Sequence, residues 1–217
     1  MIFGVDHLVF CGTSNDLARL RSRLAPAGFV PVQGRLRFDE IGAHSESLAY
    51  RGGGFVEVVY EVRSGAAPRA WFGGPIPRLM GIGVSSDDFD RDTEGWLWTM
   101  DEDHVLDDGS TLRIHAAGPH DHESELYLFA MDRPDRTLDH PSLGGTAELA
   151  SLTFGGRDVP AWQERLREWL GNENEIGNVE VSWVESGERG AHVTASFRVP
   201  AAPGWVPLAA GAIGLCD

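Results

Sequence analysis

A histidine and a carboxylate near the N-terminus have the residue types and the spacing that best suit chemistry. His7 lies within one apolar run, residues 5–10, and Glu57 lies within another, residues 55–60. Successive side chains of a strand point to opposite faces, so His7 and Glu57 can each point away from their apolar neighbours. A histidine and a glutamate that meet on one face of a sheet can share a metal ion or a substrate proton.

Two further histidines are candidates for the same site. His44 leads into the strand-like residues 47–50, and a histidine within reach of Glu57 would be oriented and made more basic by the carboxylate. We therefore expect His44 and Glu57 to be catalytic, the alternative being that His44 is a solvated imidazole in a loop. His115 ends a predicted strand, residues 112–115, and is a candidate additional ligand if that strand faces the interior.

The elements that must position these residues repeat along the chain. An apolar strand, a polar cap and an amphipathic helix occur in residues 7–28, again in residues 81–96, and again in residues 149–171. In the third copy the apolar residues recur at helical spacing, which predicts a helix whose apolar stripe packs against the core. The stripe consists of Val159, Trp162, Leu166, Trp169 and Leu170.

Strand-like segments follow each helix, so each unit is typical of a βαβββ module. The fold class that we expect is α+β, with modules that curl into half-open barrels and carry their helices outside. Two paired modules, about residues 1–63 and 78–133, would enclose a cleft within residues 1–133, and residues 146–217 would form a third, weakly similar unit. The Gly- and Pro-rich connector 64–77 between the first two modules is expected to be exposed and irregular.

The order of these segments resembles that of the vicinal oxygen chelate superfamily, of the glyoxalase, bleomycin resistance and dioxygenase type, and more narrowly that of bacterial glyoxalase-like domain proteins. The resemblance rests on residues 6–10, His44 with Leu48, and residues 55–58, 81–88, 108–109, 128–132 and 140–141. In catalytic members a first-strand histidine and a fourth-strand glutamate bind a divalent metal, which holds two vicinal oxygens of the substrate. The resemblance thus implies His7 and Glu57 as ligands of Fe, Mn, Ni or Zn, with His115 as a candidate addition.

The second and third units depart from that ligand pattern. In the second unit, Leu79, Met80 or Gly81 takes the place of His7, and residues 126–129 take the place of Glu57. In the third unit the corresponding places are Ser151 and the region of Leu208. None of these residues is a usual metal ligand. The pair can therefore also be the polar floor of a metal-free site, or a structural hydrogen bond.

Two functions are consistent with these residues. The first is a small-molecule enzyme of the vicinal oxygen chelate type, such as an isomerase, lyase or dioxygenase, which acts on a small oxygenated metabolite in the barrel cleft. The alternative is a metal-free protein of the same fold that binds or sequesters a small molecule, as resistance proteins do. The fold hosts both classes, so the fold itself does not choose between them.

Composition excludes several other classes. Lys and Arg number 18 against 33 Asp and Glu, a net charge of −15 that disfavours nucleic acid as a partner. No lysine occurs, which excludes Schiff-base and P-loop chemistry. The first residues carry neither a basic segment nor a membrane-length apolar span, and Cys11 and Cys216 lie at opposite ends, so we expect a cytoplasmic protein without disulfides. An unpaired half-barrel would expose a sheet edge and a concave face, which favours a homodimer.

Overall fold

The structure is a computed structural model that describes residues 4–32, 34–39, 42–62, 78–86, 88–119, 127–132, 145–157, 159–185, 192–200, 204–207 and 212–216. The connector 64–77, for which the sequence predicts irregular structure, lies outside the described residues. Residues 133–144, which precede the third unit, lie outside them as well.

The first described part of the chain forms a mixed nine-stranded sheet built from two modules. The first module comprises β1 (Gly4–Gly12), α1 (Ser14–Leu24), β2 (Val30–Pro31), β3 (Leu36–Phe38), β4 (Ala43–Ala49) and β5 (Phe55–Glu61). The second comprises β6 (Arg78–Ser86), α3 (Phe89–Asp92), β7 (Trp98–Val105), β8 (Thr111–Gly118) and β9 (Tyr127–Asp132). The strand order is β2-β4-β5-β1-β6-β9-β8-β7, with β3 paired to β4. Parallel pairing joins β1 to β5 and β6 to β9, and antiparallel pairing of β1 with β6 joins the two modules.

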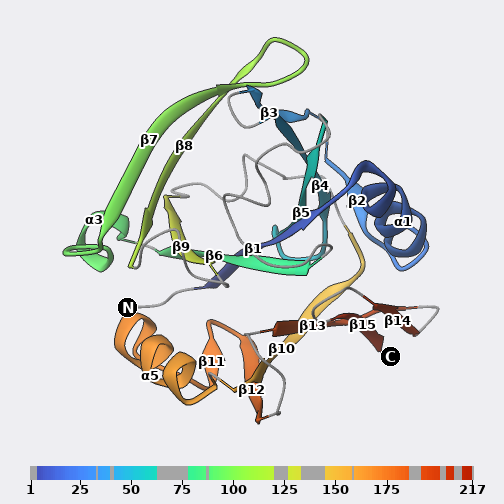
Figure 1. Cartoon of the computed structure of the whole chain (residues 1–217). Helices are drawn as coiled ribbons and strands as arrows, with labels where there is room; N and C mark the ends of the chain where they lie inside the picture. Colours follow the sequence, from blue (N-terminus) through green and yellow to red (C-terminus); the bar gives the residue numbers. More distant parts are fainter. Residues whose placement is uncertain are drawn as a thin grey trace.

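The sheet curls until its two ends approach each other, as Figure 1 shows at the top of the molecule. There Leu36 of β3 forms an isolated bridge with Leu106, which follows β7. The rings of Phe38 and His104 meet edge to face nearby, with their centroids 5.7 Å apart. The expected half-open barrel is therefore confirmed, since the ends touch at β3 and are not joined by a continuous ladder.

The third unit forms a separate six-stranded sheet beneath the first (Figure 1). It comprises β10 (Glu148–Gly156), α5 (Val159–Leu170), β11 (Glu175–Ile176), β12 (Val179–Glu185), β13 (His192–Arg198), β14 (Gly204–Pro207) and β15 (Ala212–Cys216), with strand order β11-β12-β10-β13-β15-β14. Its buried face packs on the first sheet, because the ring of Phe197 contacts those of Phe29 and Tyr50 at 4.8 and 5.1 Å. One continuous apolar core thus joins the two sheets.

The two long helices form where the sequence predicts them. Thr13 and Asp16 make a capping box at the start of α1, which satisfies backbone N–H groups that the helix leaves unpaired. The apolar stripe of α5 is buried at Val159, Trp162, Leu166 and Leu170, and Trp169 is partly buried against the core. The helix ends before Gly171, whose φ of +76° suits the residue that follows a helix.

Several elements differ from the sequence-based expectation. The sequence does not predict β7, because three acidic residues in succession, Asp101, Glu102 and Asp103, interrupt the alternation of apolar and polar residues that is typical of a strand. The helix after β6 is only four residues long and does not extend to Trp96. Residues 212–216 form β15, so Cys216 lies on a strand and not in a tail, and its thiol donates to the carbonyl of Phe197 at 3.2 Å. Both cysteines are free thiols, as expected.

The side of the second sheet that faces away from the core carries hydroxyl groups. Ser151, Thr153 and Ser182 are half-buried on this side, and the hydroxyls of Thr153 and Ser182 share a hydrogen bond of 2.9 Å. The expectation of a homodimer assumed an apolar concave face, which the described residues of this unit do not provide. Dimerisation stays a prediction, which light scattering on the purified chain would measure.

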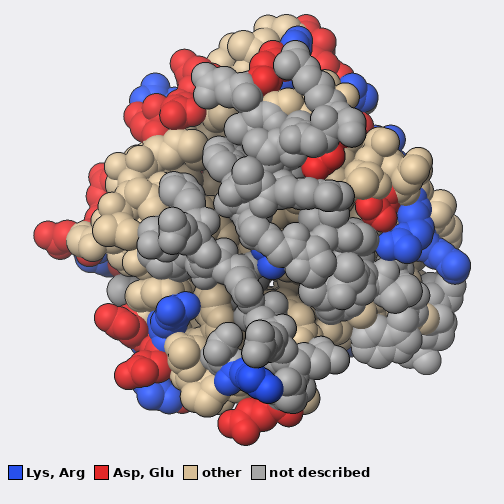
Figure 2. Space-filling view, in the orientation of Figure 1, with Lys and Arg blue, Asp and Glu red and all other residues tan. Residues whose placement is uncertain are grey.

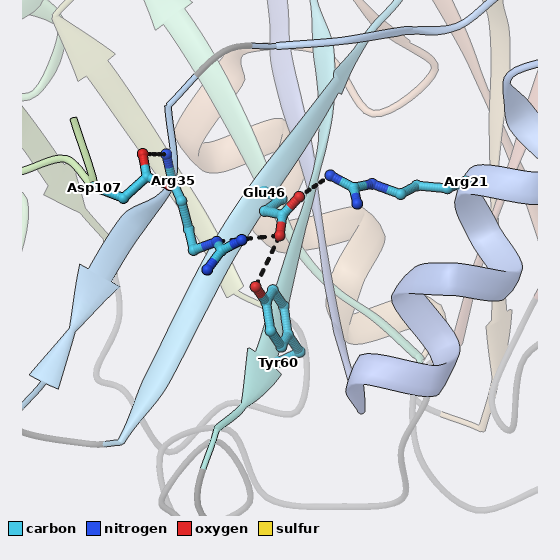
Figure 3. A network of polar contacts seen from close by, with 5 residues as sticks. All are labelled: Arg21, Arg35, Glu46, Tyr60 and Asp107. Atoms are coloured by element: carbon cyan, nitrogen blue, oxygen red, sulfur yellow. Dashed lines mark hydrogen bonds and ion pairs between the residues drawn. The ribbon is translucent and has the colours of Figure 1, made fainter.

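Glu46 of β4 connects three elements on the outer side of the barrel (Figure 3). Its carboxylate accepts hydrogen bonds from the hydroxyl of Tyr60 at 2.8 Å, from Nε of Arg35 at 3.2 Å and from the guanidinium of Arg21 on α1. The backbone N–H of Arg35 donates to Asp107 at 3.1 Å, next to the bridge that joins the sheet ends. Glu46 therefore ties α1 and β5 to the segment at which the barrel ends meet.

Replacing Glu46 by alanine is expected to lower the free energy of unfolding by about 1 to 3 kcal/mol. The carboxylate is largely buried, and its loss leaves Tyr60 and Arg35 without their acceptor. Asp101→Ala is the control, because Asp101 binds Arg113 at the exposed surface, where ion pairs contribute little. Urea unfolding of both variants makes the comparison, and equal losses would contradict the role assigned to Glu46.

The acidic excess is spread over the visible surface. Figure 2 shows acidic side chains at separate places around the edge of one face, among them α3 and the β7–β8 turn, with basic side chains between them and a group of basic ones near α1. Within the described residues, no helix is long and apolar enough to cross a membrane.

Candidate functional site

The inner face of the curled sheet is lined by apolar side chains. Buried members of this lining are Val9, Cys11, Ala43, Val59, Met80, Ala116, Phe129 and Met131, with Phe38, Trp98, Met100, Ile114 and Tyr127 partly buried beside them. The intervening residues, such as Leu8 and Val56, belong to the outer core beneath α1 and the second sheet. Strand alternation therefore assigns every second residue of β1 and β5 to the inner face.

His7 and Glu57 lie together on this inner face. Glu57 on β5 pairs with Val9 on β1. His7, two residues before Val9, has its Nε2 atom 3.7 Å from Oε2 of Glu57. The exposed fractions of the two residues are only 3% and 9%. The structure thus brings together the two residues that the sequence singled out. Their strands are far apart in the sequence and pair directly in the sheet.

Asp6 is a third member of the site, which the sequence did not indicate. Val5 pairs with Val84 and His7 with Gly83, so Asp6 is an extra residue in the ladder, a β-bulge. The bulge brings Asp6 to its neighbour, and Oδ2 of Asp6 lies 2.7 Å from Nδ1 of His7. Asp6 is 3% exposed, so His7 lies between two shielded carboxylates. A bulge depends on pairing with another strand, and nothing in the local sequence marks it.

The imidazole ring of His7 packs against two phenylalanine rings. The ring of Phe55 stacks on it with centroids 4.6 Å apart and planes 3° apart, and Phe129 meets it edge to face at 5.2 Å. Gly83 lies opposite, where a Cβ atom would be 2.5 Å from Cε1 of His7. Only glycine leaves room for the ring at this position, so the orientation of His7 is fixed before any ligand binds.

His44 lies on the opposite face of the barrel from Glu57. It is within β4 and not in a loop, and it pairs with Tyr60, whose side chain belongs to the outer core. Its ring meets that of Tyr60 edge to face at 6.1 Å. The expectation that His44 acts with Glu57 is not supported by this geometry, because neighbouring register positions on β4 point to opposite faces.

The environment of His44 nevertheless makes stability depend on pH. Burial lowers the pKa of His44 below its usual value of 6.5, and the positive charges of Arg35 and Arg37 lower it further. The unfolded chain therefore binds this proton at a higher pH than the folded chain does. The contribution of neutral His44 to the stability of the folded chain is therefore complete above pH 6.5. It is lost as the pH falls from 6.5 through the lower pKa that His44 has in the folded chain.

A His44→Asn variant is expected to lose less stability than the original chain when the pH is lowered from about 7.5 to about 5.5. Asparagine keeps a polar side chain at this strand position but does not titrate. Urea unfolding at several pH values measures both slopes, and equal slopes would show that His44 does not contribute.

His115 also lies away from the pair. Its strand neighbours Ile114 and Ala116 belong to the inner lining, so His115 points outward, where its ring meets Phe89 with centroids 4.4 Å apart. Its Nδ1 lies 3.2 Å from Oδ2 of Asp132. It is therefore not brought to His7 and Glu57 as an additional ligand. His104 is on the inner side of β7, where its ring contacts that of Phe38.

The described residues do not complete a metal centre of the kind that the family resemblance implies. His7 and Glu57 supply two candidate ligands, but no group of three or more ligating side chains occurs in the described ranges. His7 pairs with Phe55, two residues before Glu57, and Gly81 pairs with Tyr127, two residues before Phe129. Gly81 and Phe129 thus take the places of His7 and Glu57 in the second module.

A further polar group of the inner face is the phenol of Tyr127 on β9. Burial raises its pKa, so the phenol stays neutral at physiological pH. Together the site offers a fixed imidazole, a shielded carboxylate directed at it, and an apolar aromatic surround. Such an arrangement can transfer a proton to or from a small molecule that carries an oxygen function.

Comparisons with known proteins identify the fold. No family model matches the chain, and no curated protein matches it. A hypothetical protein from Staphylococcus aureus has a similar structure, with a TM-score of 0.73, 8% identity and 99% of each chain covered. A variant of 4-hydroxymandelate synthase from Streptomyces coelicolor has a TM-score of 0.58 and 11% identity, over 90% of this chain and 71% of that one.

A third similar structure is a xylose isomerase-like TIM barrel/4-hydroxyphenylpyruvate dioxygenase fusion protein. Its TM-score is 0.56 at 14% identity, and the match covers 90% of this chain but 36% of the fusion. At these identities the likeness concerns the fold alone. The two named enzymes have vicinal oxygen chelate folds, so the fold implied by the resemblance is confirmed.

Proposed function

We propose that this chain is a small-molecule enzyme of the vicinal oxygen chelate type, which acts on a small oxygenated metabolite at the inner face of residues 1–133. The observation that carries the proposal is the buried series Asp6–His7–Glu57, in which each side chain is positioned by the sheet. An acid or base that a second group orients and that is shielded from water is the usual arrangement for proton transfer.

The reaction class that fits this series is proton transfer at a carbon next to a carbonyl. A His7 ring protonated on both nitrogens donates Nδ1–H to Asp6 and offers Nε2–H to the carbonyl oxygen of the substrate. The carboxylate of Glu57 accepts the proton from the adjacent carbon while the Nε2–H proton of His7 passes to the carbonyl oxygen, which leaves an enol or enediol, a neutral imidazole and a protonated Glu57. Glu57 then returns its proton to the other face of the same carbon while the oxygen returns its proton to His7, which gives an epimer. In an enediol, Glu57 protonates the former carbonyl carbon while the hydroxyl on the carbon that lost its proton gives a proton to His7, which gives an isomer. In both cases His7 and Glu57 regain their starting protonation.

A second function has its own supporting observation. Gly81 and Phe129 occupy the second-module places of His7 and Glu57, so only one half of the barrel carries the polar pair. A protein that binds or sequesters a ligand without a metal and without turnover does not need a second histidine–glutamate pair.

Solvent-deuterium exchange distinguishes the two functions. The purified chain is incubated in D₂O with a panel of 2-hydroxy ketones and 2-oxo acids, and proton NMR follows loss of the signal next to the carbonyl. Exchange above that of buffer and of heat-denatured protein supports the enzyme. Binding of the compounds without any exchange would favour sequestration. Metal content of protein purified without chelators is measured in parallel, and a near-stoichiometric metal that a Glu57→Gln variant loses would restore a metal-dependent mechanism.

A further inference from the structure

We propose that the inner face binds a planar aromatic group of the substrate, beside the His7–Glu57 pair, so that the substrate is an aryl compound with an adjacent oxygen function. The inference rests on the proposed function for the reacting group, and on a separate set of side chains for the aromatic part. These side chains form one row across the sheet.

The row runs across six strands at the level of His7. Phe55 pairs with His7, His7 with Gly83, and Gly83 with Phe129. Gly118 lies one residue beyond the last paired position of β8 with β9, and it pairs with Trp98 on β7. In strand order the row is Phe55, His7, Gly83, Phe129, Gly118 and Trp98, in which rings and glycines share the inner face.

The two glycines let the neighbouring rings lean over the sheet. A Cβ at Gly83 would be 2.5 Å from the His7 ring, and a Cβ at Gly118 would be 2.3 Å from the Trp98 indole. Both rings therefore lie over backbone that carries no side chain. Because His7 and Trp98 lean from opposite sides, both rings incline toward the strand that carries Phe129.

The row continues into a stack at its half-buried end. The indole of Trp98 and the ring of Tyr127 are parallel within 2° with centroids 5.6 Å apart, and Tyr127 contacts Phe129 at 5.2 Å. Phe55 and Phe129 are buried, whereas Trp98 and Tyr127 are only half-buried. A flat ligand ring that extends this stack gains the offset-stacked geometry that aromatic groups prefer.

The carboxylate lies within the same neighbourhood as the rings. Glu57 pairs with Val9, Val9 with Gly81, and Gly81 with Tyr127, so Glu57 and Tyr127 share the next row of the inner face. A substrate whose aryl group contacts Trp98 and Tyr127 extends its oxygenated carbons toward His7 and Glu57. Met80, Met100 and Met131 line the same face and can adapt to ligands of different outline.

Three ketones that share one reacting group test the inference. They are 2-hydroxyacetophenone, cyclohexyl hydroxymethyl ketone and hydroxyacetone, which carry a planar aromatic ring, a non-planar ring of similar size and a methyl group. Calorimetry measures their dissociation constants. We expect the aryl ketone to bind at least about 5-fold more tightly than the cyclohexyl ketone, and at least about 10-fold more tightly than hydroxyacetone.

Variants connect that preference to the row. In Trp98→Ala the dissociation constants of the aryl and cyclohexyl ketones are expected to differ by less than about 2-fold, whereas Trp98→Phe keeps a measurable preference for the aryl ketone. Tyr127→Leu provides a second variant in case Trp98→Ala does not fold, and Trp169→Ala, on α5, is the control that keeps the original preference.

The outcomes separate this inference from the proposed function. Equal affinity for the aryl and cyclohexyl ketones, or no detectable binding of the aryl ketone at millimolar concentration, overturns aromatic recognition even if deuterium exchange occurs. A Trp98-dependent preference for the aryl ketone without exchange supports aromatic recognition and removes the enzyme function. A preference that Trp98→Ala leaves unchanged also overturns the assignment to this row.

Discussion

A Glu57→Gln variant is expected to exchange the substrate proton about 10²- to 10⁴-fold more slowly than the original chain. Glutamine has nearly the shape of glutamate but has no basic oxygen, so the variant keeps the packing and loses the base. The effect should appear in the rate of turnover more than in the affinity for the ketone, because binding depends chiefly on the surrounding rings. Deuterium exchange at saturating and at low ketone concentrations separates the two quantities.

The matched control for this prediction is Glu180→Gln. Glu180 lies exposed on β12 of the second sheet, so its replacement changes the net charge equally but leaves the inner face unchanged. Glu180→Gln is expected to exchange at the original rate. If Glu57→Gln retained that rate as well, Glu57 would not be the base, and its proximity to His7 would be structural.

The positions of His7 and Glu57 could be predicted from sequence because each belongs to a continuous strand. Both strands were recognisable from their apolar runs, and their parallel pairing follows from the connecting helix α1. The same reasoning failed for His44 and His115, because a change of one residue in register transfers a side chain to the other face. The strand-like pattern before Glu57 covers only residues 47–50, whereas β4 begins at Ala43 and includes His44.

Asp6 shows a second kind of limit. A regular strand would direct Val5 and His7 to the same face, yet Val5 lies in the outer core and His7 lies on the inner face. The bulge at Asp6 separates them and brings Asp6 to Nδ1 of His7. The third unit repeats this feature, since the β10–β13 ladder shifts between Leu149 and Ser151.

The third unit therefore repeats the geometry of the site without its chemistry. Ser151 occupies the place of His7, as matching the strand–helix units predicted. Ser182 pairs with Thr153 as Glu57 pairs with Val9, so Ser182, and not the region of Leu208 that the sequence predicted, takes the place of Glu57. The hydroxyl of Ser182 shares a hydrogen bond with that of Thr153 on a half-buried face, and Ser151 and Ser182 provide neither a base nor an imidazole. We therefore expect the function to lie in the first unit, and the third unit to contribute mainly to stability.

A Leu166→Ala variant tests that division of roles and is expected to lower the free energy of unfolding by about 2 to 5 kcal/mol. Leu166 is 1% exposed in the buried stripe of α5, which packs against β10 and β12. Truncation removes buried apolar surface and leaves a cavity that the surrounding sheet fills only in part. Chemical unfolding measures the loss, and ketone binding per folded molecule is expected to stay unchanged.

Leu97→Ala is the control for this substitution, because Leu97 is 65% exposed and its truncation leaves no cavity. It is expected to change stability far less than Leu166→Ala does. A folded Leu166→Ala protein that had lost ketone binding or proton exchange would contradict the structural role of α5. The third unit would then belong to the site, because disturbing its packing would have changed the inner face on the other side of the shared core.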